Sequence, residues 1–162
     1  MRFFVVAAAL ALTHPCLLSA QTLPAPTISA TPALDLSYAT PIAGSWSYAA
    51  TGDGSETTFS NQAGFIQLWV HCSRVARRIT IAKPASSAAP FVNVWSSSLT
   101  QSVPSSFNPA TGRLTIDLSS YDPLLDAIAS SRGRIGFAVA GQAPLIIPAW
   151  AETARVIEDC RA

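Results

Sequence analysis

The chain has 162 residues, 49% of them hydrophobic and 12% charged, with ten lysines and arginines against nine aspartates and glutamates. This near-neutral balance provides no charge excess that would draw the protein to nucleic acid or to an anionic membrane surface. The length suffices for one domain with a buried core. Because the sequence contains no phosphate loop and no dinucleotide fingerprint, we expect no cofactor.

The first 20 residues have the three parts of a secretory signal. These parts are the positive charge of Arg2, an apolar run from Phe3 to Leu12 and a small residue at position 20. We therefore expect a signal peptide at 1–20 and a mature chain that begins at Gln21, in the periplasm or outside the cell. The apolar run is shorter than the about 20 residues that span a bilayer, and no later stretch is long and apolar enough.

Three cysteines occur, and one of them, Cys16, lies within the signal. A lipoprotein anchored at Cys16 is an alternative, but the residues before it lack the small pair that lipoprotein processing requires. The two that remain, Cys72 and Cys160, are an even pair in an exported chain and favour a disulfide. Separate thiols or a metal site are the alternatives. Only His71 adjoins Cys72, and a metal site needs more ligands, so we expect no metal.

Residues 21–43 are rich in Pro, Ala, Ser and Thr, which is typical of an extended linker. We place a single β-rich domain at 44–162. Apolar residues alternate with polar ones along most of this region, as in half-buried strands. Strands are predicted at 46–48, 65–72, 77–82, 91–95, 99–103, 113–118, 135–139 and 145–147. In the second of these, the row that ends at Cys72 should face the core, and His71 should face away from it.

Two short helices are predicted besides the strands, one between two strands and one at the C-terminus. Asp122 followed by Pro123 is typical of a helix start, and Gly133 should follow the end of that helix. Pro148 should open a terminal helix whose inner side carries Trp150, Ala154, Ile157 and Cys160. These elements predict a mainly β fold, an antiparallel β-sandwich or open barrel with two short helices, the C-terminal one packed on the sheet.

The 40 residues from Tyr121 to Cys160, YDPLLDAIASSRGRIGFAVAGQAPLIIPAWAETARVIEDC, run from an acidic cap through a Leu-rich helix and two strands to a closing helix. This order resembles the C-terminal half of the invasion-associated locus B family, exported β-sandwich proteins of alphaproteobacteria. It is also similar to small envelope proteins associated with type VI secretion, which end in a comparable helix with a cysteine. The close cysteine pair of the first family is absent here. The resemblance implies an exported bacterial envelope protein, and its motifs are structural, so no functional residue carries over.

No residue is predicted to be catalytic. His71 is the only histidine of the mature chain, Lys83 is the only lysine, and no Gly-x-Ser-x-Gly elbow accompanies them. A small periplasmic hydrolase with a site near His71 is an alternative, because a histidine beside a carboxylate can act as a general base.

A binding surface is the more favoured hypothesis. The candidate residues combine a basic cluster with aromatic side chains, as in many glycan and anion sites. They are Phe65, Trp69, His71, Arg74, Arg77, Arg78 and Trp95. The arginines could instead protect an edge strand, and a second sheet could cover the aromatic row. We therefore expect a non-catalytic envelope module that binds a protein or glycan partner, with a purely structural envelope protein as the other alternative.

Overall fold

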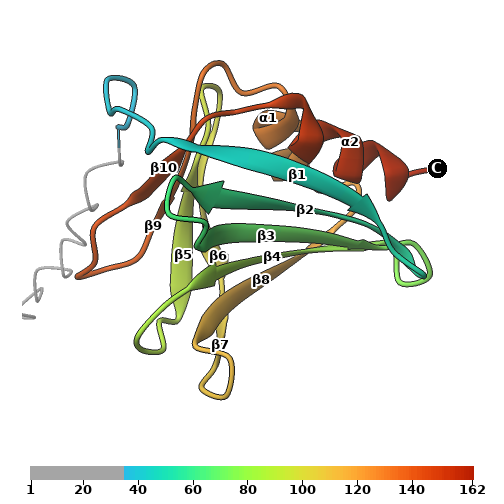
Figure 1. The fold of residues 1–162 in the computed structure, drawn as a ribbon, viewed down its shortest axis with the longest axis horizontal. Helices are drawn as coiled ribbons and strands as arrows, with labels where there is room; N and C mark the ends of the chain where they lie inside the picture. The colour runs from blue at the N-terminus through green and yellow to red at the C-terminus, as the bar shows by residue number, and fades with distance from the viewer. Residues whose placement is uncertain (1–34) are drawn as a thin grey trace, which may run out of the picture. The chain divides into compact units, whose positions relative to one another are not determined.

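The computed structural model describes residues 35–162, so the predicted signal at 1–20 and most of the predicted linker lie outside the described residues (Figure 1). The described part contains ten strands and two helices. In chain order these are β1 (Gly44–Ala50), β2 (Gly54–Asn61), β3 (Ile66–Ser73), β4 (Arg78–Pro84), β5 (Phe91–Trp95), β6 (Thr100–Pro104), β7 (Ser106–Asn108), β8 (Arg113–Ser119), α1 (Pro123–Ala129), β9 (Ile135–Ala138), β10 (Leu145–Ile147) and α2 (Ala151–Asp159).

The strands form two antiparallel sheets. One has six strands in the order β1-β2-β3-β4-β8-β7, and the other has four in the order β10-β9-β5-β6. Both sheets are open and do not close into a barrel. In Figure 1 the strands of the four-stranded sheet run across the direction of the six-stranded sheet. The predicted mainly β architecture with two helices is confirmed.

The core lies between the two sheets and under the two helices. Leu68, Val70 and Cys72 point inward from β3, out of phase with His71, as the alternation predicts. Opposite them, Val94 and other buried apolar side chains come from the four-stranded sheet. Ile66 departs from the prediction: it is 42% exposed, because a bulge after Phe59 shifts the register of β2 and β3 at this end.

The strand β2 was not predicted. Its sequence, GSETTFSN, has one large apolar residue, and yet Ser55 and Thr57 are fully buried. Thr57 tolerates burial because its hydroxyl donates a hydrogen bond to the carbonyl of Ser47 in β1, at 2.6 Å. β2 lies between β1 and β3, and these neighbours provide the packing that its own sequence does not indicate.

The first helix, α1, follows its sequence signal. Asp122 accepts a hydrogen bond from the backbone N–H of Leu124, and Pro123 takes the first helical position. Gly133, beyond the helix end, has a φ of 79°, which suits glycine. Neither helix of residues 35–162 is long and apolar enough to cross a bilayer.

The terminal helix α2 packs against α1 and the inner side of β1, β2 and β3, as predicted, but its buried side is shifted. The helix begins at Ala151, and Trp150 precedes it with 49% of its surface exposed. The buried residues are Thr153, Val156, Ile157 and Cys160, which recur at spacings of three and four. The predicted inner row through Trp150 and Ala154 is therefore wrong, because the helix starts three residues later than Pro148.

A disulfide joins Cys72 of β3 to Cys160 at the end of α2, which confirms the predicted pair. The two Cα atoms lie 5.5 Å apart, within the usual range for a disulfide. Both cysteines are fully buried, so the bond fixes the end of the helix onto the inner face of the six-stranded sheet.

The packed structure extends upstream of Gly44, where the predicted linker was placed. Leu36 is only 6% exposed, and a Cβ atom at Gly136 of β9 would overlap its side chain. The Arg134 guanidinium donates to the carbonyls of Leu36 and Ala39. The boundary at Gly44 is therefore too late, because the buried Leu36 side chain and the hydrogen bonds from Arg134 fix residues 36–39 to the domain.

Candidate functional site

The structure does not bring the seven predicted surface residues together. Trp95 ends β5 in the four-stranded sheet and is buried, whereas Trp69 and His71 lie on the outer face of the six-stranded sheet. Phe65 lies in the turn before β3 and is 68% exposed. The remaining three, the arginines, lie at the opposite end of β3.

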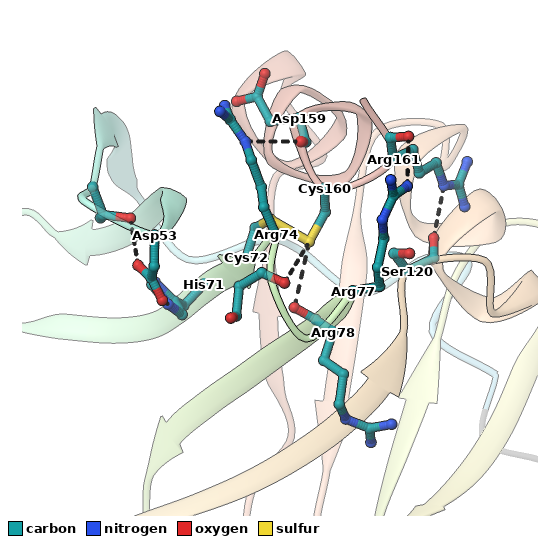
Figure 2. The surroundings of a disulfide bond; sticks show 12 residues. Asp53, His71, Cys72, Arg74, Arg77, Arg78, Ser120, Asp159, Cys160 and Arg161 are labelled. Carbon is teal, nitrogen blue, oxygen red and sulfur yellow. Dashed lines mark hydrogen bonds and ion pairs between the residues drawn. A yellow bond between two sulfur atoms is a disulfide. The ribbon is translucent and has the colours of Figure 1, made fainter.

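The arginine cluster holds the end of α2. Arg74 donates from Nε to the carbonyl of Asp159 at 3.2 Å, and Arg77 donates from Nη1 to the carbonyl of Arg161 at 3.0 Å (Figure 2). Cations at a helix C-terminus satisfy its free carbonyls and interact favourably with its dipole. Arg78 donates to the carbonyl of Asp117 at 3.1 Å. Because β3 and β4 are interior strands, protection of a sheet edge does not explain these arginines.

The outer face around Trp69 is a network of side chains that contact one another. Trp69 donates from Nε1 to Glu56 at 2.9 Å, and its ring is stacked on His71 with centroids 5.2 Å apart. The Arg113 guanidinium lies 6.0 Å from the centre of the Trp69 ring. The second sheet packs on the opposite face, so it does not cover this row as one alternative proposed. Ring faces and polar groups that already have neighbours offer little to a ligand.

His71 is poorly placed to act as a general base. Its Nε2 atom lies 3.2 Å from Asp53, and its Nδ1 atom is buried without a hydrogen-bond partner, 3.8 Å from Glu56. Hydrogen bonds from Thr51 and from His71 hold the pKa of Asp53 below its usual range. A base must reach the proton that it removes, and His71 lines neither of the two cavities described for residues 35–162.

A different site, which the sequence did not indicate, lies where β1 begins. A groove of about 650 Å³ is lined by parts of residues 41–45, 60–64 and 148–150. Its volume falls within the range of about 300–1,000 Å³ that is common for ligand sites. None of the three segments contains a charged residue, and exposed Trp150 and Ile42 provide apolar walls.

Hydrogen bonds between distant segments hold the walls of this groove. The N–H of Ile42 donates to the carbonyl of Ile146 at 2.8 Å, and the Trp46 indole donates to the carbonyl of Pro148 at 2.9 Å. Two exposed apolar residues neighbour the groove without lining it: Phe65 follows Gly64 in the chain, and Ile66 pairs with Ser60 in the sheet.

The sequence missed this groove because its three walls lie far apart along the chain. The composition of residues 41–43 is typical of a linker, and the spacing of apolar residues predicts Trp150 on the buried side of the terminal helix. One signal was available: Pro148 precedes Trp150 by two residues, and a helix that starts after both leaves the indole outside it.

Comparison of the chain with family models, with curated proteins and with solved structures finds no match to any of them. Function therefore has to be inferred from the site itself.

Proposed function

We propose that this chain is an exported, non-catalytic binding module of the cell envelope, and that the groove beside Trp150 holds its protein or glycan partner. The observation that carries the proposal is an open, uncharged groove of about 650 Å³ with a half-exposed tryptophan in its wall. Contiguous apolar surface rimmed by polar residues is typical of interaction sites, and here Ile42 and Trp150 lie in one groove with polar Ser60 and Asn61. Such a groove favours an uncharged ligand, because a buried charge without a partner is costly.

Export is supported by the signal pattern at 1–20 and by the disulfide, since disulfides persist in oxidising compartments. Mass analysis of the N-terminus of the exported protein tests this part. We expect a chain that begins at Gln21 or its pyroglutamate form. A lipid-modified Cys16 would contradict it.

Binding is tested by sedimentation of the purified protein with an envelope fraction. We expect the parent and a Tyr38→Ala control to sediment with the fraction, and the Trp150→Ala variant to remain in the supernatant. Tyr38 is a matched control because it is an aromatic residue that is 96% exposed and does not line the groove. The melting temperatures of the three proteins should agree, since both aromatic side chains are exposed.

Treatment of the envelope fraction separates the two kinds of partner. Protease treatment should abolish binding to a protein, and glycan hydrolases should abolish binding to a polysaccharide. If all three proteins sediment equally, the groove is not the site. If none sediments, a purely structural role replaces the binding module.

A further inference from the structure

The free edge of β1 differs from the other sheet edges of the described chain. β7 and β10 have three residues each, and β6 ends in Pro104. β1 has seven residues, GSWSYAA, without a charge or a proline. Edge strands are normally short, charged or interrupted by proline, because their unpaired N–H and C=O groups can pair with another chain. β1 has none of these protections.

The first half of β1 is the part of this edge that borders the groove. Within residues 35–162, β1 pairs along one side with β2 alone (Figure 1). Its second half lies close to α2, since the Tyr48 hydroxyl donates to Asp159 at 2.6 Å and Arg155 lies 3.8 Å from the Tyr48 ring centre. Ser45 and Ser47 are exposed. The stretch from Gly44 to Ser47 precedes the Tyr48 contacts, and Gly44 and Ser45 line the groove, so a strand that also reaches the groove has to pair along this stretch.

The groove begins where this edge begins. Gly44 and Ser45 belong to both, and Ile42 and Trp150 form the apolar wall beyond them. A strand paired along Gly44–Ser47 would pass this wall, and one of its side chains would enter the groove. Backbone pairing along a free edge supplies affinity, and a pocket for a side chain supplies specificity.

We propose that the groove and the free edge of β1 form one site, which binds an extended, uncharged peptide segment of a partner protein by strand addition. A bulky apolar side chain of that segment lies against Trp150 and Ile42. The inference rests on the proposed function and specifies its ligand as a peptide segment instead of a glycan. A peptide fits better than a glycan, because only a peptide backbone offers N–H and C=O groups at the spacing of a strand edge.

The test selects ligands from 12-residue peptides displayed on phage, with the purified disulfide-bonded protein as bait, followed by synthesis of the selected peptides. We expect uncharged sequences with one constant large apolar position. Their affinity should fall about tenfold or more for the Trp150→Ala variant, as for the loss of an aromatic anchor, and should be unchanged for Tyr38→Ala.

Backbone methylation then separates strand addition from simple pocket binding. Alternate N–H groups of an added strand point toward β1, and the others point away from it. Methylation of the first set should weaken binding about tenfold or more through lost hydrogen bonds, and methylation of the second set should leave it nearly unchanged. Equal effects of the two sets, or binding that Trp150→Ala leaves intact, would overturn the proposal.

The outcomes also distinguish this inference from the function that it narrows. If no peptide is selected but the envelope fraction binds through Trp150 and loses its binding with glycan hydrolases, the binding module stands and strand addition fails. If neither peptides nor the envelope fraction binds, both fail.

Discussion

Lys83, the only lysine of the chain, faces inward from β4 and is 8% exposed. Its ammonium donates to the carbonyl of Pro84 at 3.1 Å, beside a cavity of about 10 Å³ between the sheets. A cavity of this size holds about one water molecule at most. Burial lowers the pKa of Lys83, because the charged form loses hydration. This lysine therefore carries a stability cost and has no space for a substrate.

We predict that Lys83→Met raises the free energy of unfolding at neutral pH by about 1 kcal/mol, since methionine fills a similar volume without a charge. The pKa of the lysine is lower in the folded chain than in the unfolded chain, so the cost is full below the folded value. It is relieved as the pH rises toward about 10.5. Urea unfolding at several pH values checks this. If the increase in the free energy of unfolding stays the same at high pH, the buried charge of Lys83 is not its cause.

The Tyr48 hydroxyl hydrogen bond holds the pKa of Asp159 below its usual range, ahead of smaller contributions that include nearby arginines. A depressed carboxylate pKa stabilises the fold above the unfolded value of about 4 and loses this effect as the pH falls through the folded value. We predict that Tyr48→Phe lowers the free energy of unfolding by about 1 kcal/mol at pH 7, because the acceptor is charged but partly solvated. The difference should vanish in strong acid. A constant difference across pH would show that lost packing is the cause.

At the scale of secondary-structure elements, the position of α2 on the sheet depends on the Cys72–Cys160 disulfide. The disulfide closes a separation of 88 residues, and Arg74 and Arg77 add hydrogen bonds at the same helix end. We predict that Cys160→Ser lowers the free energy of unfolding by about 2–5 kcal/mol, the usual cost of losing a native disulfide in a small domain. Thermal melting checks this, and reductant should lower the parent to a similar temperature.

A matched control separates the stability contribution of the disulfide from that of the arginines at the same helix end. Arg74→Ala removes one carbonyl contact of the helix end and leaves the disulfide intact, so it should cost about 1 kcal/mol. Two free thiols in the purified parent, found by mass spectrometry without reductant, would contradict the role given to the bond.

For the molecule as a whole, the packing of residues 36–39 decides where the folded unit begins. We predict that a chain that starts at Pro41 is less stable than one that starts at Asp35 by about 2 kcal/mol, because it lacks the buried Leu36 side chain. The difference corresponds to several degrees in melting temperature. Leu36→Ala in the longer chain should reproduce most of the loss. Equal melting temperatures of the two chains would restore the boundary near Gly44.

The elements whose signals are local could be predicted from the amino-acid sequence. The alternation from Leu68 to Cys72 predicted an inward and an outward face, and Asp122 with Pro123 predicted the start of α1. The even cysteine pair predicted the bond from β3 to α2. These signals are readable because side chains alternate every two residues in a strand and helix starts require particular side chains.

The other features depend on contacts between segments that are distant along the chain. β2 carries almost no apolar alternation, and it is a strand because β1 and β3 pair with it on both sides. The seven candidate surface residues are spread over two sheets and two ends of β3, because sequence spacing does not say which strands are neighbours. The groove combines residues 41–45, 60–64 and 148–150, none of which carries a motif. Its shape comes from contacts between segments about 100 residues apart, such as the Trp46 indole on the Pro148 carbonyl, and no local pattern encodes such contacts.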